Sequence, residues 1–277
     1  MDIKYNYKLM RKILQQNAVQ LNKLEDILQE ISSRVFNRLD FIKITPNKIL
    51  DCGYGSGYDN HLLKAKFNNS EYYNLDLIKD LLPTNQSGWL KKILNKSTDL
   101  SIIANALAMP FKSNIFDLIY ANLVIPYIDD IEQYINEIFR TIAVGGTCVL
   151  SGFGVDSFKE LRELGLSTFR FPDMHDIGDM LIAAGFNNPV VDTEYLKIQY
   201  DSLAQALQEM QIVGCGAANS TELQSILTKQ QYQNIQNKLH DPINITIELF
   251  VVHGWKDSLK VQLPDGLSPI KFVSKNA

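Results

Sequence analysis

The chain has 277 residues, enough for one large domain or two modest ones, and 45% of them are hydrophobic while 21% are charged. This composition excludes a disordered or collagen-like chain, because an apolar fraction of this size builds a buried core. The 27 Lys and Arg residues against 31 Asp and Glu residues give a formal net charge of -4. No overall positive field is therefore present to hold nucleic acid or an anionic membrane.

Two further features indicate a soluble protein of a reducing compartment. Residues 1–12 lack the continuous apolar stretch of a signal peptide, and no stretch approaches the roughly 18 apolar residues of a membrane span. Cys52, Cys148 and Cys215 lie far apart without a Cys-x-x-Cys pair, so we interpret them as small buried hydrophobic residues. The histidines are scattered, so we predict no metal site. We expect a cytoplasmic protein with no nucleic-acid or membrane partner.

The first predicted element is a long helix over residues 7–39, where Leu, Ile and Val recur at three- and four-residue spacings without Gly or Pro. Pro46 ends it, and the apolar run at 48–51 leads directly into a glycine-rich turn, which predicts a first strand and a loop. A short helix is expected at 61–65. Further strands are predicted at 72–76, 100–104, 116–121 and 147–152.

The clearest predicted helix covers residues 131–142. Its apolar side chains form one stripe, and Gly145-Gly146 follow as a stop signal. In the last third of the chain, helices are predicted at 173–184, 203–213 and 221–239, and extended segments at 190–200 and 245–252.

Strands that alternate with helices predict an α/β fold, with a mainly parallel sheet covered by helices on both faces. We divide the chain into an N-terminal helical segment at 1–45 and an α/β domain at 46–277. Within that domain we predict a helical insertion at about 155–240 that covers the ligand end of the sheet. No internal repeat is present in the sequence.

A glycine-rich loop follows the first predicted strand, in the segment Asp51-Cys52-Gly53-Tyr54-Gly55-Ser56-Gly57. Such a loop lets the backbone approach a ligand at the carboxyl end of a parallel sheet. A dinucleotide fingerprint needs a further glycine at the sixth position, where Tyr58 stands, so NAD is only a minor alternative. An acidic residue opens the loop, and a carboxylate there suits a ligand that carries an ammonium and a sulfonium rather than a pyrophosphate.

This loop resembles the first motif of class I S-adenosylmethionine (SAM)-dependent methyltransferases. The resemblance implies SAM as the cofactor and a Rossmann-like fold with a seven-stranded, mainly parallel sheet. Asp51 is then expected to face the amino acid end of SAM, which the loop wraps through Gly53, Gly55 and Gly57. Asp76 stands about twenty residues after the last glycine, where a strand-end acid takes the two ribose hydroxyls.

Two later segments extend the resemblance. Residues 105–111 resemble the family's Asp-Ala-x-x-Leu-Pro-Phe, and residues 116–122 resemble its Phe-Asp-x-x-x-x-Asn. They imply cofactor contacts at Asn105, Ala106 and Asn122. In the family an Asp at the position of Asn105 meets the adenine amino group. An Asn carbonyl still accepts that hydrogen bond without the charge-assisted part, so we expect weaker cofactor binding.

Beyond this common core, the chain from about residue 33 to 255 resembles the malonyl-carrier-protein O-methyltransferases of biotin synthesis. The segments that carry the resemblance are 33–42, 150–154, 158–162, 170–179, 184–190, 214–219 and 248–255. It implies methyl transfer to the free carboxylate of malonyl-acyl carrier protein, or of malonyl-CoA. The methyl ester neutralises the carboxylate, so that fatty-acid elongation enzymes accept the malonyl group as a substrate. A sister group is similar: the complex I assembly factors, associated with arginine hydroxylation of a partner subunit. The run at 173–179 favours the biotin enzymes.

Methylation of a carboxylate needs no general base, because a carboxyl group with a pKa of about 4 is already ionised at neutral pH. Catalysis then consists of alignment and exclusion of water. A guanidinium suits a malonyl carboxylate, so Arg170 is the first catalytic candidate, and Tyr127 is a second that lines the methyl-donor end. We expect a monomer that docks the acidic carrier protein through Lys159, Arg162 and Arg170.

Several alternatives stay open. Arg170 is equally consistent with an exposed loop arginine, Tyr127 with a core aromatic residue, and the basic face with an ordinary solvated helix. The fold also suits a hydroxylase or assembly factor of a respiratory subunit. Cys52 and Tyr54 depart from the family's small aliphatic residue and Cys. With Asn105, these departures favour a third hypothesis, a non-catalytic scaffold whose SAM pocket has decayed.

Overall fold

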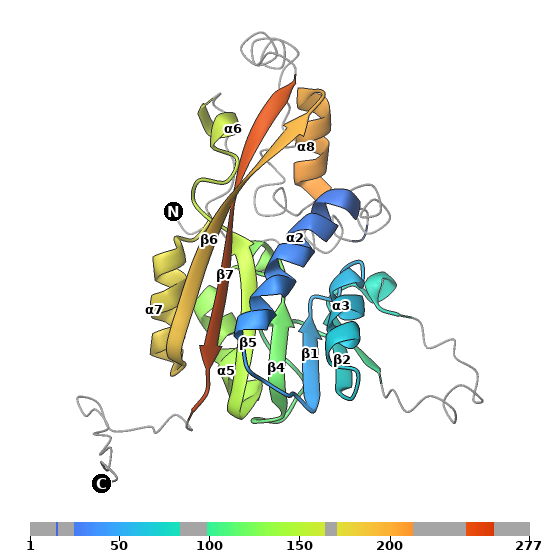
Figure 1. Cartoon of the computed structure of the whole chain (residues 1–277), viewed down its shortest axis with the longest axis vertical. Helices are drawn as coiled ribbons and strands as arrows, with labels where there is room; N and C mark the ends of the chain where they lie inside the picture. The colour runs from blue at the N-terminus through green and yellow to red at the C-terminus, as the bar shows by residue number, and fades with distance from the viewer. Residues whose placement is uncertain (1–14, 16–24, 84–98, 164–170, 213–241, 258–277) are drawn as a thin grey trace.

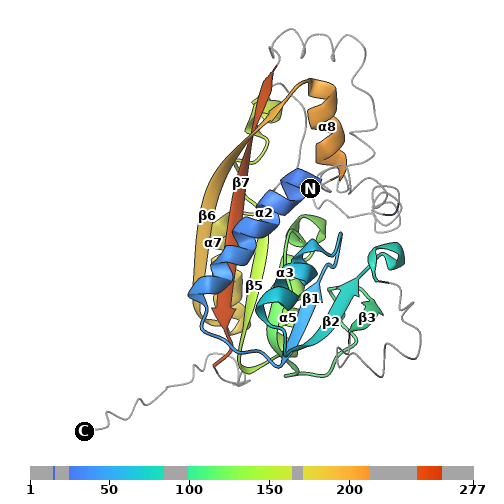
Figure 2. The same ribbon diagram turned by 45° about the vertical axis from the view of Figure 1, so that its right-hand side comes forward.

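The computed structural model describes residues 15, 25–83, 99–163, 171–212 and 242–257, which build a seven-stranded sheet with helices on both faces (Figure 1 and Figure 2). The strands are β1 (Lys48–Cys52), β2 (Glu71–Asp76), β3 (Leu100–Ile103), β4 (Phe116–Ala121), β5 (Ile142–Phe153), β6 (Asn187–Tyr200) and β7 (Ile243–Trp255). The helices are α2 (Glu25–Asn37), α3 (Tyr58–Lys66), α5 (Ile131–Thr141), α6 (Lys159–Glu163), α7 (Met174–Ala184) and α8 (Leu203–Ile212). Short 3-10 turns are η2 (Arg38–Phe41), η3 (Lys79–Leu81) and η4 (Ile125–Tyr127).

The strands follow the order β3-β2-β1-β4-β5-β7-β6 across the sheet. Strands β1 to β5 run parallel, whereas β7 is antiparallel to β5 and β6 is antiparallel to β7. The order reverses between β1 and β4, and open α/β sheets bind their ligands at such a switch point, outside the carboxyl ends of the strands. The predicted α/β fold with a seven-stranded, mainly parallel sheet is confirmed.

Each face of the sheet has its own hydrophobic core. Helices α2 and α3 pack on one face, where Val35 is fully buried, and α5 and α7 pack on the other, where Ile138 is fully buried. Strand β1 contributes side chains to both cores, Ile49 to the first and Leu50 to the second. Successive side chains of a strand point to opposite faces, which explains this division.

Helix α2 lies within the helix predicted at 7–39, and most of the earlier part of that prediction falls outside the described residues. Arg34 forms an ion pair with Glu194 of β6. In the turn that follows α2, Arg38 pairs with Asp192 at 2.7 Å. The N-terminal helix is therefore tied to the far edge of the sheet, and it crosses one sheet face in Figure 1 and Figure 2.

Strands β6 and β7 are long and continue beyond the end of β5 (Figure 1). Strand β5 pairs with β7 only as far as Phe153 opposite Leu249, whereas β6 pairs with β7 as far as Tyr200 opposite Ile243. Helices α6 and α8 pack against this projecting pair of antiparallel strands. The projection rises from the carboxyl end of β5, the end at which α/β folds place their sites.

The insertion predicted at about 155–240 is not helical throughout. Its described residues include α7, which covers one sheet face, and β6, which is a strand of the central sheet. Among the described residues of this stretch, α6 and α8 lie at the projecting strands, whereas α7 and β6 belong to the main sheet and its cover. Whether this stretch caps the ligand end of the sheet stays a prediction. The helix predicted at 221–239 lies outside the described residues, and the domain boundary at residue 45 stays a prediction.

Candidate functional site

The glycine loop between β1 and α3 lies at the switch point of the sheet. Gly53, Gly55 and Gly57 have φ angles of 84°, 52° and 78°. A Cβ atom at Gly53 would lie 2.4 Å from Cγ2 of Val124, and one at Gly57 would lie 2.6 Å from Oη of Tyr54. A side chain at Gly53 or Gly57 would therefore strain the backbone and displace Val124 or Tyr54.

Asp76 holds the glycine loop against the end of β2. Its carboxylate accepts hydrogen bonds from the N–H of Gly55 at 3.0 Å and from the N–H of Ile78 at 2.8 Å. The N–H of Gly53 donates to the carbonyl of Leu75 at 2.8 Å. The glycine loop and Asp76, which we predicted to bind the same ligand, are thus in direct contact.

Asp51 ends up buried, with 2% of its surface exposed, and its Oδ2 atom has no hydrogen-bond partner. The pKa of Asp51 is raised to about 8, first by burial and next by the charge of Asp59. A buried carboxylate oxygen without a donor is costly, and a cationic ligand would supply the missing partner. The residues present therefore fit the ammonium and sulfonium groups of SAM.

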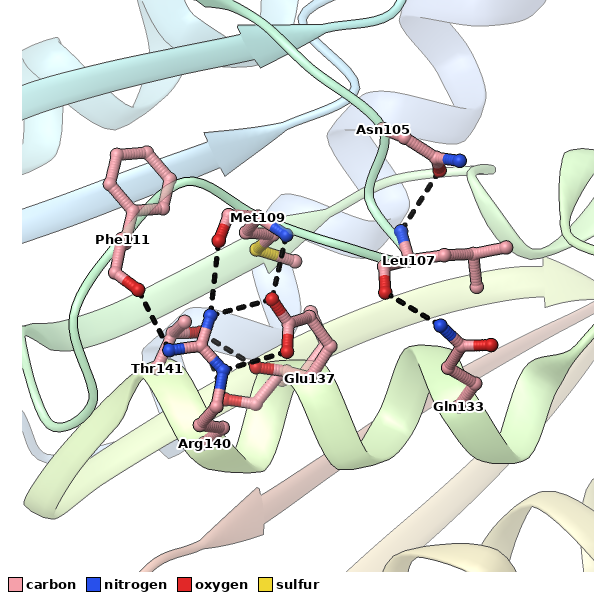
Figure 3. A network of polar contacts seen from close by, with 9 residues as sticks. Asn105, Leu107, Met109, Phe111, Gln133, Glu137, Arg140 and Thr141 are labelled. Atoms are coloured by element: carbon pink, nitrogen blue, oxygen red, sulfur yellow. Dashed lines mark hydrogen bonds and ion pairs between the residues drawn. The ribbon is translucent and has the colours of Figure 1, made fainter.

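Asn105 opens the loop between β3 and β4. Its Oδ1 accepts a hydrogen bond from the N–H of Leu107 at 3.0 Å, while its amide nitrogen points away from this turn (Figure 3). Unlike an Asp at this position, Asn105 can therefore also donate a hydrogen bond. Gln133 of α5 donates to the carbonyl of Leu107 at 3.0 Å and fixes the turn, and Ala106 is buried within it.

An ion pair on α5 holds the next part of the same loop (Figure 3). Oε1 of Glu137 accepts a hydrogen bond from the N–H of Met109 at 2.6 Å. Arg140 pairs with Glu137 at 2.6 Å and donates to the carbonyls of Met109 and Phe111 at 3.1 and 2.7 Å. Sequence reasoning missed these two side chains, because it used only the apolar stripe of the helix.

Asn122 lies at the end of β4 in a polar network. Its Nδ2 donates to Ser32 and to Asp59, at 3.0 Å each, and its Oδ1 accepts from the hydroxyl of Ser151 at 2.6 Å. Its amide thus joins α2, α3 and β5 through protein partners. The cofactor contact expected of Asn122 stays a prediction.

Asp59 is a candidate that sequence reasoning missed. It stands in the first turn of α3, directly after the glycine loop, and is partly buried. Burial raises the pKa of Asp59, while hydrogen bonds from Asn122, Tyr120 and Ser32 lower it. The signal that could have found Asp59 is an acidic residue in the first turn of the helix that follows a ligand loop.

Of the two catalytic candidates, Tyr127 lies among the described residues. Tyr127 is half-buried at the end of η4, and its N–H donates to the carbonyl of Val124 at 2.9 Å. Because Val124 lies against Gly53, this turn adjoins the glycine loop. Arg170 lies outside the described residues.

The predicted docking surface includes α6, where Lys159 is half-buried. Arg162 donates to the carbonyl of Ser157 at 2.6 Å and also to that of Val155, so its guanidinium holds its own loop. Docking of a carrier protein on this surface stays a prediction.

Cys52 and Cys148 are buried free thiols, and burial raises the pKa of each to about 12. Neither is a nucleophile at neutral pH, in line with the interpretation of both as buried hydrophobic residues. Cys215 lies outside the described residues. In the part of the chain that the structure describes, no three metal-ligating side chains gather, and no helix is long and apolar enough to cross a membrane.

The sheet order, with an acid-opened glycine loop at the switch point, defines a fold of the class I SAM-dependent methyltransferases. Residues 50–150 match the family model described as "Methyltransferase domain". Among solved structures, a SAM-dependent methyltransferase of Thermotoga maritima has a TM-score of 0.53 at 15% identity, covering 89% of this chain and 99% of that one. The YcgJ protein of Bacillus subtilis has a TM-score of 0.57 at 15% identity, covering 83% and 99%.

Whole-chain relatives give the particular family. The malonyl-acyl-carrier-protein O-methyltransferase of Methylovorus sp. is 30% identical over 257 residues, 88% of this chain and 87% of that protein. The protein of the same name from Gallionella capsiferriformans is 30% identical over 97% of both chains. The chain belongs to the malonyl-acyl-carrier-protein O-methyltransferase family. The human mitochondrial arginine-hydroxylase NDUFAF5 is also similar, at 24% identity over 84% of this chain and 71% of that protein.

Proposed function

We propose that this chain transfers a methyl group from SAM to the free carboxylate of malonyl-acyl carrier protein or malonyl-CoA, giving a malonyl methyl ester that primes biotin synthesis. The observation that carries the proposal is the buried, unpartnered Oδ2 of Asp51 beside the glycine loop, which calls for a cationic ligand. Membership of the family supports the choice of acceptor.

Each polar residue of the site has a role that its contacts allow. Asp51 takes the ammonium of the cofactor, directly or through water. Asp76 takes the ribose hydroxyls, because a carboxylate offers about four lone-pair sites and the backbone N–H groups that it binds leave part of them free. Asn105 and Ala106 take the adenine, on a loop that α5 holds.

When bound, SAM supplies an electrophilic methyl group on a positively charged sulfur. No residue of this chain has to remove a proton, because the malonyl carboxylate is ionised at neutral pH. The chain contributes alignment of the carboxylate and exclusion of water. We assign the malonyl carboxylate to Arg170 and the methyl-donor end to Tyr127. The protein acts as a monomer in the cytoplasm, with the acidic carrier protein as its partner.

The test is mass spectrometry of malonyl-acyl carrier protein after incubation with the purified protein and SAM. We expect a gain of one methyl group. Asp76→Ala should slow the reaction about 100-fold or more, because it removes charge-assisted contacts to both the loop and the ribose. Asp80→Ala, an exposed acid nearby on η3, is the matched control and should retain full activity.

The other outcomes separate the alternatives. SAM binding without methylation of the carrier protein or of malonyl-CoA would overturn the acceptor and favour the hydroxylase or assembly function. No binding of SAM at millimolar concentration would favour the decayed scaffold.

A further inference from the structure

A second carboxylate stands close to Asp51. Oδ2 of Asp59 accepts hydrogen bonds from the hydroxyl of Ser32 at 3.2 Å and from Nδ2 of Asn122 at 3.0 Å, and Oδ1 accepts from the hydroxyl of Tyr120 at 3.1 Å. All three neighbours can donate to the ionised form of Asp59 and lower its pKa, while burial, the larger effect, raises the pKa above its ordinary value. Within the described residues, Asp59 forms no ion pair with a Lys or Arg.

The sheet itself brings Asp59 close to Asp51. Tyr120 is the partner of Asp51 in the neighbouring parallel strand, so both side chains leave the sheet on the same face, and the Tyr120 hydroxyl then reaches Asp59. The charge of Asp59 accordingly adds to burial in raising the pKa of Asp51. The charge of Lys64 lowers the pKa of Asp51 and is the smallest of these effects, and the Lys64 ammonium itself forms an ion pair with Asp99.

The Oδ2 atom of Asp51 is buried without a hydrogen-bond partner, and a cationic ligand bound there would lie near both carboxylates. The methyl donor SAM and its product S-adenosylhomocysteine share the adenosine and the amino acid, and they differ by one positive charge on sulfur. A carboxylate near the site can act on that difference without touching the ligand, because charges in a partly buried site interact over several ångströms.

We propose that Asp59 is a specificity-determining residue, whose negative charge makes the site prefer the cationic methyl donor over the neutral thioether product. Loss of the sulfonium charge during transfer then weakens binding of the product and favours its release. The inference rests on the proposed function, because it assumes SAM as the ligand.

The test compares the dissociation constants of SAM and S-adenosylhomocysteine, by isothermal titration calorimetry, in the wild type and in Asp59→Asn. We expect the preference for SAM to fall about fivefold or more in the variant, mainly through weaker binding of SAM. Ser32→Ala is the matched control, because it removes one hydrogen bond from the same carboxylate and keeps the charge. Its preference should equal that of the wild type.

Equal losses of affinity for both ligands in Asp59→Asn would overturn the inference and leave Asp59 a structural residue. The amide nitrogen of an Asn at position 59 would face hydrogen-bond donors, so Asp59→Ser serves as a second neutral variant. Asp59→Glu keeps the negative charge and should keep the preference for SAM. A wild type that binds neither ligand contradicts the proposed function, whereas binding of both with a preference insensitive to the Asp59 charge contradicts this inference alone.

Discussion

Asp51 lies at the end of β1, where its carboxylate is removed from water and one oxygen has no donor. Its pKa of about 8 means that the folded chain keeps a proton that the unfolded chain loses near pH 4. Between these values the folded state binds more protons, so the stability contributed by protonated Asp51 is full below about pH 4 and is lost as the pH rises through 8. The residue to which we assign the ammonium of SAM therefore makes the ligand-free fold less stable as the pH rises.

Asp51→Asn should make the ligand-free protein more stable and weaken its binding of SAM. We expect the Tm of the ligand-free variant to exceed that of the wild type by about 5 °C or more at pH 8, with a much smaller gain at pH 4. The affinity for SAM should fall about tenfold or more, because the bound cation favours the ionised form of Asp51 and an Asn side chain carries no charge. Thermal melts from pH 4 to 9, with titration calorimetry, measure both effects. A gain in Tm that does not depend on pH would contradict the assigned pKa.

At the scale of elements, α5 shows what periodicity predicts well and where it stops. The helix predicted at 131–142 is confirmed and ends at Thr141, one residue before the predicted end. Its apolar stripe is a local signal, which is why periodicity finds it. Strand β5, predicted from 147, begins at Ile142 instead. Gly145 reads as a helix stop but lies within the strand, and its N–H donates to the carbonyl of Lys256 at 2.7 Å. That partner is distant in sequence, so no local pattern could predict the pairing.

The polar side of α5 supports a prediction about the loop at 105–111. Arg140→Ala removes two hydrogen bonds to loop carbonyls and the partner of Glu137. We expect about tenfold weaker binding of SAM, because the adenine side of the site loses its support. Asn136→Ala, on the same helix, is the control, because among the described residues the Asn136 side chain bonds to the carbonyl of Glu132 and to no part of the loop. Titration calorimetry would contradict this role if Arg140→Ala lowered Tm but left the affinity unchanged.

At the scale of the whole molecule, the N-terminal helix and the turn after it belong to the core of the fold. Leu39 of η2 is 1% exposed in the same core cluster as strands from both halves of the sheet. Two residues later, Phe41 is 79% exposed. Helix α2, η2 and the strands β6 and β7 are therefore expected to unfold together.

Leu39→Ala should lower the free energy of unfolding by about 2–5 kcal/mol, because it leaves a cavity in this core. Phe41→Ala removes a larger side chain from the surface and should change the free energy by less than about 0.5 kcal/mol. Urea unfolding followed by circular dichroism measures both. Similar losses in the two variants would contradict the placement of η2 in the core.

The sequence by itself determined the α/β fold, the glycine loop and the two strand-end acids, because each is a local pattern of hydrophobicity, glycine spacing or position after a strand. Only the tertiary structure decided which polar side chains meet. Ser32 and Asn122 bond across 90 positions of the chain, and Asp59 faces Tyr120 across 61. Such pairings depend on strand order and on the face from which each side chain leaves the sheet, and neither is written in any short stretch of sequence.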